Sequence, residues 1–498
     1  MTIRRGFDQP GGGSTGGHTR ISGIRAPGNP PVHAAVRNAK LAALPVAFAG
    51  RQALGLGKRA LGRSAAEVDR EIGARTAQHI FEVLGELKGC ATKLGQVLAI
   101  YELALPPKLA ESYKIALGRL QDSAPAMLPA TVRMVMAQHF GHDWRSRFRE
   151  FDERRAAPAS IGQVHRAVWH DGRTVAVKLM YPGARESVRG DLAQLRGIST
   201  LAAVFMPGAD VRALTEELCA CLLAELDYAE EARCQRAFAA AYADDPDFRV
   251  PEVVEQRGDV LISEWLDGTP APRVAASGAR RDRDRVGMLM VRFVLDGCAR
   301  TELLYSDPHP GNFLLLPDGR LGVVDFGACR TWSPDGFEDM ALDYCRAVFE
   351  GDPHELASTS RRHGFVRAER VFDVNALYAA ALSYGEPLRH RTFRMSSPWL
   401  RRQVVRATRP HLTNVARDCD IPVYFTPFAR ATVTLLGALA QLEAEGSYRD
   451  EVVRSFPALA EVFDRLDQRE PEPVDLRAVR ERRAARSVGS GAGIRRTP

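Results

Sequence analysis

The segment 305–327 contains Asp307, Asn312 and Asp325, three oxygen-bearing side chains that the sequence places at strand and loop ends. Phosphoryl transfer needs such side chains, because a carboxylate orients the acceptor and hard oxygen ligands hold Mg²⁺ against the phosphates. Two short apolar runs joined by a turn sequence predict a β-hairpin over 313–324. The hairpin would place the three polar side chains at strand and loop ends. A hairpin with solvated aspartates at its ends is the alternative interpretation.

The spacing of the three residues favours chemistry over that alternative. Asp307 precedes Asn312 by five residues, as the catalytic Asp precedes the metal-binding Asn in a kinase catalytic loop, and Asp325 begins an Asp-Phe-Gly sequence. A lone Asp-Phe-Gly carries little information, whereas the three residues in this order indicate phosphoryl transfer with ATP and Mg²⁺. The stretch does not indicate which acceptor takes the phosphoryl group.

A second candidate for phosphate binding lies upstream. A small-residue segment with Ala157, Ala159 and Ser160 leads into a strand, a turn sequence at 171–172, and the strand sequence Val-Ala-Val-Lys that ends at Lys178. A strand, a loop and a returning strand are typical of a flap over a nucleotide, whose Lys reaches the α- and β-phosphates. A lysine at a strand end is commonplace by itself, but its position after this flap favours phosphate binding.

An acidic cluster follows in a region of predicted helices. Glu225, Asp227 and Glu231 fall within two helical turns. Such a cluster can simply be a solvated helix face; the functional interpretation pairs one Glu with Lys178 and places another acid near the metal. Farther along, an apolar strand that reaches Glu264 is where a kinase hinge would offer backbone groups to adenine.

Positive charge is concentrated at the two ends of the 498-residue chain. The net charge is +7, but residues 1–66 hold ten Lys or Arg against one acid and residues 469–498 hold eight Arg against four acids, which leaves −6 for residues 67–468. A globular nucleic-acid-binding protein more often carries its positive charge on the folded body, so no nucleic-acid partner is expected. The composition of both ends predicts disorder, and basic tails can also contact anionic lipid headgroups.

The cysteines and the hydropathy indicate the compartment of the protein and its relation to the membrane. The eight cysteines are scattered without a Cys-x-x-Cys pair, which argues against a zinc site and favours a reducing compartment. No run of 18 or more apolar residues predicts a membrane-spanning helix. We therefore expect a cytoplasmic protein with at most peripheral membrane contact, for which the mildly apolar residues 41–56 could supply a surface helix.

Together these segments resemble the UbiB/ADCK family of atypical protein-kinase-like proteins, which is linked to ubiquinone and related isoprenoid-quinone metabolism. The resemblance covers roughly residues 75–450 and rests on four motifs in the family's order. They are Lys-Leu-Gly-Gln at 93–96, similar to the family's KxGQ motif; Ala-Pro-Ala-Ser-Ile-Gly-Gln-Val-His at 157–165, similar to its alanine-rich loop; Glu225 and Asp227 followed by Glu231, similar to the ExD element and the helix-αC Glu; and residues 307–312 with 325–327, similar to its catalytic and metal loops.

The resemblance implies a role for each matching residue. Lys178 would hold the phosphates and Glu231 would pair with it. Asp307 would be the catalytic aspartate, while Asn312 and Asp325 would bind Mg²⁺.

It also implies restricted access to the site. Lys93 and Gln96 would lie over the active site near Glu225 and Asp227. There they would occupy space that a protein substrate would need. ATP hydrolysis, autophosphorylation or a small or lipid acceptor is therefore expected ahead of ordinary protein phosphorylation. Pro158 departs from the family pattern, where Ala is usual, and removes a backbone N–H from the loop.

The implied fold is α+β and bilobal, with a small β-sheet N-lobe and a mostly helical C-lobe. The expected organisation is a basic tail with a possible surface helix at 1–66, a helical extension carrying KxGQ at 67–145, the N-lobe at 146–268, the C-lobe at 269–468 and a second basic tail at 469–498.

The implied function is Mg²⁺-dependent phosphoryl transfer or ATP hydrolysis in support of ubiquinone, menaquinone or other isoprenoid-lipid metabolism. An isoprenoid lipid, an anionic membrane surface and quinone-biosynthesis proteins would be its partners. Two alternatives stay open at this point: a small-molecule phosphotransferase of the aminoglycoside/choline-kinase type, and a nucleotide-binding pseudokinase scaffold.

Overall fold

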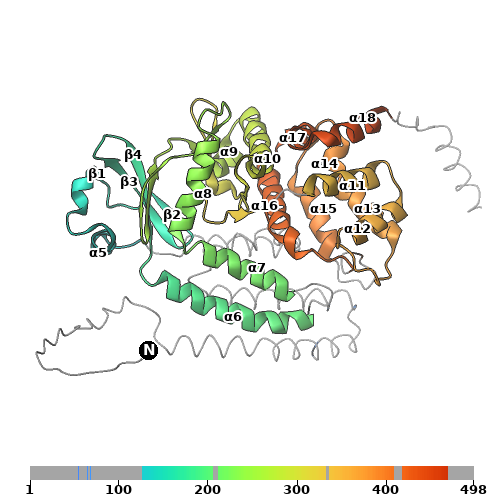
Figure 1. The fold of residues 1–498 in the computed structure, drawn as a ribbon, viewed down its shortest axis with the longest axis horizontal. Coiled ribbons are helices and arrows are strands. Elements are labelled where there is room, and N and C mark those ends of the chain that lie inside the picture. Colours follow the sequence, from blue (N-terminus) through green and yellow to red (C-terminus); the bar gives the residue numbers. More distant parts are fainter. Residues whose placement is uncertain are drawn as a thin grey trace, which may run out of the picture.

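A computed structural model describes residues 126–205, 211–332, 336–408 and 418–468, together with the single residues Leu54, Ser64, Val68 and Val415. The described chain forms a sheet-containing lobe and a helical lobe, seen at the left and right of Figure 1. The fold is therefore α+β and bilobal, as predicted. The predicted tails, most of the predicted surface helix and the Lys93–Gln96 motif lie outside the described residues.

The N-lobe is built on an antiparallel sheet in the order β1-β3-β4-β7-β6, with β2 paired to β3 at one end. The strands are β1 (Phe148–Phe151), β2 (Ala157–Ala159), β3 (Gly162–Trp169), β4 (Thr174–Met180), β6 (Val253–Arg257) and β7 (Val260–Glu264). Alternate residues of β4 point to opposite faces, so Val175, Val177 and Leu179 pack toward helix α5 (Pro129–Phe140). Lys178 lies on the other face.

That other face is covered by three helices, α6 (Ala184–Phe205), α7 (Val211–Ala224) and α8 (Tyr228–Ala241). Helices α6 and α7 form a pair beneath the lobe in Figure 1, while α8 lies alongside the sheet. The helices predicted around the acidic cluster of Glu225, Asp227 and Glu231 are thus confirmed. Their arrangement brings Glu231, in the first turn of α8, over the strand that carries Lys178.

The hairpin predicted over 313–324 is present as β10 (Phe313–Leu315) and β11 (Leu321–Val323), with Phe313 opposite Val323. Gly319 in its turn has a φ of 84°, a conformation that glycine adopts without steric cost. The hairpin belongs to a four-stranded sheet in the order β5-β11-β10-β8. The flanking strands are β5 (Phe248–Arg249) and β8 (Thr269–Pro270), and a separate pair is formed by β9 (Leu303–Leu304) and β12 (Arg330–Thr331).

The C-lobe is helical, and Figure 1 shows α10 and α16 between the N-lobe and helices α11, α12, α13 and α15. Its helices are α9 (Ala271–Ser277), α10 (Arg280–Thr301), α11 (Phe337–Phe349), α12 (Pro353–Arg362), α13 (Val374–Tyr384), α14 (Glu386–Arg389), α15 (Ser397–Thr408), α16 (Thr426–Leu442), α17 (Tyr448–Ser455) and α18 (Ala460–Gln468), and β13 (Phe393–Arg394) pairs with β14 (Glu445–Gly446). The largest hydrophobic core gathers around α10 and α16. Among the described helices, none is long and apolar enough to cross a membrane.

Candidate active site

Lys178 and Glu231 form the ion pair that the sequence predicted. The Lys178 Nζ lies 2.6 Å from Glu231 Oε1 and 3.5 Å from Asp325 Oδ1. The pair lies in the interior, with 16% of the Lys178 side chain and 2% of the Glu231 side chain exposed. The ring of Tyr228 lies 5.2 Å from the ammonium, in a cation–π contact. A strand, a helix and a loop thus converge on one ammonium group.

The cluster holds more negative than positive groups, because the carboxylates of Glu231 and Asp325 lie next to a single ammonium. Burial opposes the charge of Lys178, but Asp325 and Glu231 outweigh it and raise the pKa of the ammonium above its usual value. Burial, followed by Asp325, raises the pKa of Glu231 to about 7, although Lys178 works in the opposite direction. Asp325 and Glu231 both favour the charged Lys178, whereas Asp325 and Glu225 oppose the charge of Glu231, so the cluster has room for a further positive charge.

Hydrogen bonds to backbone carbonyls fix the conformation of the loop formed by residues 307–312. The carbonyl of Asp307 accepts hydrogen bonds from the amide of His309 (2.7 Å) and from the Asn312 side-chain Nδ2 (3.1 Å). The Asn312 carbonyl in turn accepts from the amide of Val324, at the end of the hairpin (2.9 Å). Because Nδ2 of Asn312 is a donor within the loop, its amide oxygen is the atom that could ligate a cation.

Asp325 adopts a left-handed backbone conformation with a φ of 67°. Such a conformation is uncommon for a residue other than glycine and clusters at functional sites. Oδ1 accepts from the amide of Gly327 (3.3 Å) and faces Lys178. The next residue, Phe326, is fully buried and packs 5.2 Å from Phe238 of α8 and 5.5 Å from Tyr305. The aromatic core therefore fixes the backbone immediately after Asp325.

The residues present fit Mg²⁺ together with a nucleotide. Among the described residues no three His, Cys, Asp or Glu side chains gather as metal ligands, but Mg²⁺ at phosphate sites takes one or two protein oxygens and completes its shell with phosphates and water. Asp325 and Asn312 would supply those two oxygens. The excess of carboxylates and the buried Oε2 of Glu231, which makes no hydrogen bond to the described chain, also favour an added cation here.

Comparison with known proteins assigns the chain to a family. Residues 119–360 match the model of the ABC1 atypical kinase-like domain. The chain belongs to the ABC1 atypical kinase-like family. This confirms the resemblance to UbiB/ADCK proteins that the motifs indicated.

The relatives include mitochondrial proteins and one bacterial structure. The chain is 32% identical to the mitochondrial atypical kinase coq-8 of Caenorhabditis elegans over 64% of its own length and 42% of the relative's, and 32% identical to atypical kinase COQ8 of Saccharomyces cerevisiae over 52% and 51%. It thus spans about half the length of these curated relatives. The solved complex of Rv3197 with erythromycin, from Mycobacterium tuberculosis, has 37% identity and a TM-score of 0.60, and it covers 80% of this chain and 100% of that one.

The alanine-rich segment of this ABC1 chain is a strand followed by a turn. Ala157 and Ala159 lie in β2, and Ser160 lies in the turn that leads into β3. Pro158 faces solvent on this edge strand, a position where a missing N–H is tolerated. Gly162 follows where a Cβ would approach the Leu179 carbonyl oxygen to 2.1 Å, so only glycine allows this close pairing of β3 and β4.

A series of hydrogen bonds between buried side chains behind the flap was not predicted from the sequence. The Gln163 Oε1 accepts from the amide of Met127 (2.8 Å), and its Nε2 donates to His165 Nε2 (2.7 Å). His165 Nδ1 donates to the carbonyl of Asp152 (2.9 Å). Gln163 and His165 are fully buried, and burial lowers the pKa of His165, so the ring is neutral. The chain of bonds ties the segment before α5 to the strand that follows the alanine-rich turn.

Three of the predicted binding residues have structural partners. Asp227 is the N-cap of α8 and accepts from the amides of Ala229 and Glu230, each at 3.1 Å. Glu225 is buried at the junction of α7 and α8 and adds to the negative potential at Glu231. Glu264 ends β7, where its carboxylate pairs with Arg249 at 2.6 Å. The predicted roles of these acids at the nucleotide stay predictions, and Lys93 and Gln96 lie outside the described residues.

Proposed function

We propose that this ABC1 protein binds Mg²⁺–ATP between its lobes and hydrolyses it or transfers its γ-phosphoryl group to a small acceptor. The observation that carries the proposal is the convergence of Lys178, Glu231 and Asp325 within hydrogen-bonding and ion-pair distance, next to a loop that positions Asn312 and Asp307. Kinase-like catalysis consists largely of positioning and electrostatic stabilisation, and these residues supply both.

Each residue has one task in this proposal. Lys178 binds oxygens of the α- and β-phosphates, and Glu231 fixes the direction of the ammonium. Asp307 accepts a hydrogen bond from the acceptor hydroxyl or water and takes its proton as the new P–O bond forms and the bond from the γ-phosphorus to the bridging oxygen of ADP breaks, so that ADP leaves. Asn312 and Asp325 would hold Mg²⁺, which neutralises charge on the transferred group. The alanine-rich turn at Ser160 covers the phosphates from the N-lobe side.

The proposed acceptor is water or a small or lipid molecule rather than a protein hydroxyl. This follows from the Lys93–Gln96 motif, which in the family is thought to occupy ground that a protein substrate would need. The proposed setting is isoprenoid-quinone metabolism, as the family resemblance implies, at or near an anionic membrane surface. A scaffold without catalysis is the weaker proposal, because every polar residue that Mg²⁺–ATP chemistry requires is present.

The test is steady-state ATP hydrolysis by the purified full chain, with Mg²⁺ and with or without anionic liposomes. Asp307→Asn should lower the rate about 100-fold or more, since removal of a general base costs that much. The matched control is Asp318→Asn on the exposed hairpin turn, where Asp318 pairs with Arg320, and it should leave the rate unchanged. An Asp307→Asn variant as active as wild type would contradict the role of Asp307, and hydrolysis absent from wild type would favour the scaffold.

A further inference from the structure

The helical C-lobe contains an apolar cavity of about 430 Å³ that is partly open to solvent. Side chains from several helices line it, among them Leu295 of α10, Met340 of α11, Leu377 of α13 and Phe428 of α16. Protein interiors are close-packed, and their voids are normally few and little larger than a water molecule. Ligand sites, in contrast, occupy about 300–1,000 Å³ and are mostly apolar. The size and the lining of this cavity are those of a ligand site.

Helix α13 shows independently that this part of the lobe is incompletely filled. Its sequence is almost wholly apolar or small, yet none of its residues is buried. A helix that is apolar around its circumference is normally enclosed by protein on all sides. Leu377 packs against the smaller core of the C-lobe and also lines the cavity. The missing contacts of α13 are therefore contacts that a bound molecule could supply.

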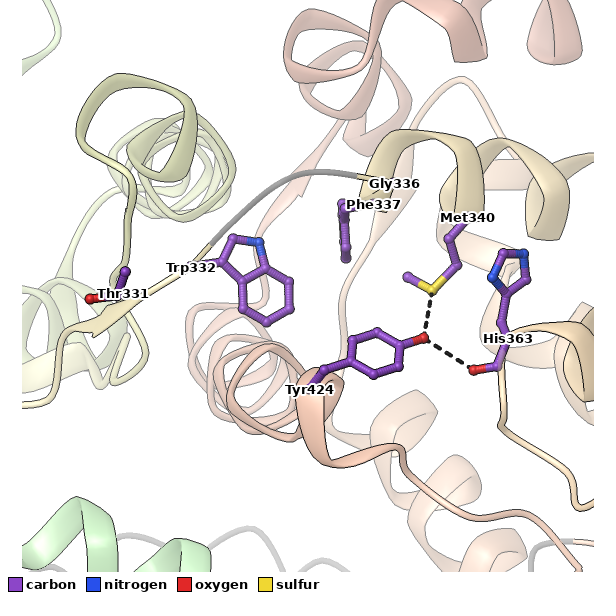
Figure 2. A pocket seen from close by; sticks show the side chains of 7 residues that line it. All are labelled: Thr331, Trp332, Gly336, Phe337, Met340, His363 and Tyr424. Carbon is purple, nitrogen blue, oxygen red and sulfur yellow. Dashed lines mark hydrogen bonds between the residues drawn. The ribbon is translucent and has the colours of Figure 1, made fainter.

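A second cavity, of about 390 Å³, adjoins the first and shares Phe337 and Met340 with it. Figure 2 shows that its wall is partly polar: the hydroxyl of Tyr424 donates to the His363 carbonyl (3.1 Å) and lies 3.7 Å from the sulfur of Met340. Thr331 borders the same space. The two cavities together offer a hydrocarbon-lined body and an end with hydroxyl groups.

The lining indicates the charge of the ligand. Among the described residues that line the larger cavity none is charged, and their polar groups are the hydroxyls of Tyr344 and Ser360 and two thiols. Burial raises the pKa of Tyr344 to about 12, so its hydroxyl stays neutral. A carboxylate or ammonium that left water for this lining would lose hydration without gaining an opposite charge from the described residues. The described lining therefore favours a neutral ligand.

We propose that these two cavities form one binding site for a neutral, mostly hydrocarbon small molecule that carries a hydroxyl or carbonyl group. None of the lining residues belongs to the nucleotide site, so the proposal is independent of the proposed function. Thr331 of β12, which borders the polar end, is separated from the Asp-Phe-Gly sequence by three residues.

The first experiment locates binding directly. The full chain, labelled with [¹³C-methyl]methionine, is titrated with decan-1-ol and, separately, with decanoate, which has a chain of equal length and an anionic head. The methyl signal of Met340, assigned by its loss in Met340→Leu, should shift saturably with the alcohol and stay unchanged with the carboxylate. The signal of Met136, buried in the N-lobe, should not move with either.

A pair of variants makes the test specific. Ala341→Leu fills the larger cavity and should weaken binding of the alcohol by roughly tenfold or more. Ala379→Leu places the same change on the exposed side of α13 and should bind as wild type does. Mg²⁺–ADP binding by both variants reports an intact fold and an independent nucleotide site. An unchanged Met340 signal in wild type, equal binding by Ala341→Leu, or decanoate binding as tight as that of the alcohol would overturn the proposal.

Discussion

The candidate nucleotide site and the C-lobe cavity are assembled in opposite ways. At the candidate site, charged side chains meet at short distances, and an aromatic core that includes Phe238, Phe293 and Phe326 packs against the segment that carries Asp325. In the C-lobe, apolar helices surround a space of about 430 Å³, and the apolar helix α13 has no buried residue. Contacts within the protein thus hold the charged side chains in place, whereas the cavity lacks contacts that a ligand would complete.

A substitution in the aromatic core next to Asp325 should have the largest effect on stability. Phe238→Ala removes a fully buried ring that contacts Phe293 (5.4 Å) and Phe326 (5.2 Å), and we expect it to lower the free energy of unfolding by about 4 kcal/mol. Chemical denaturation measures this. A loss below about 1 kcal/mol would mean that this core is packed as loosely as the cavity, and the comparison would fail.

Breaking the ion pair between Lys178 and Glu231 should have the second-largest effect on stability. Lys178→Met leaves Glu231 buried without its partner, and we expect a loss of about 3 kcal/mol in the free energy of unfolding along with the loss of nucleotide binding. Changing Glu231 to Gln in the same chain should restore much of the stability but none of the binding, because the phosphate ligand stays absent. Equal stability of the single and the double variant would show that Glu231 carries no charge that Lys178 must balance.

The buried His165 should make the stability depend on pH. Burial lowers its pKa from the ordinary value of 6.5, while Asp152 and Glu153 oppose the shift in part, so the folded protein favours the neutral ring. The unfolded chain binds a proton at higher pH than the folded chain, so this contribution is present above pH 6.5 and is lost as the pH falls below it. Thermal unfolding between pH 7.5 and 5 measures the loss, and His165→Gln should reduce it. An identical pH profile for the variant would exclude His165 as the cause.

The cavity should show the smallest effect. Leu377→Ala removes methyl groups that already border empty space, so we expect a loss of about 1 kcal/mol or less, well below the usual cost of a buried Leu→Ala change. Denaturation of this variant beside Phe238→Ala compares the two regions directly. A loss near 4 kcal/mol would show that Leu377 is as well packed as the aromatic core.

Local motifs made the arrangement of the charged residues of the candidate site predictable. The order of Lys178, Glu231, Asp307, Asn312 and Asp325 is readable from the sequence because each residue lies in a short pattern with its own chemistry. Their placement on a strand, a helix and the two ends of a hairpin agrees with the prediction.

Contacts that depend on the tertiary fold were not predictable in the same way. The bond from Met127 to Gln163 spans 36 residues, and no local pattern announces it. The cap at Asp227 did have a signal, because Asp227 and Glu230 have the spacing of a capping box. The C-lobe cavity depends on how several helices pack, and helical periodicity in the sequence says nothing about the volume left between them.

The measurement that tests the central claim most directly is calorimetric titration of the full chain with ADP, with and without Mg²⁺. The account predicts that Mg²⁺ strengthens ADP binding in wild type and in Asp318→Asn, and that Asp325→Asn removes this Mg²⁺ dependence, because Asp325 lies beside Lys178 as the carboxylate ligand. Magnesium-dependent binding of wild-type strength by Asp325→Asn would contradict the account.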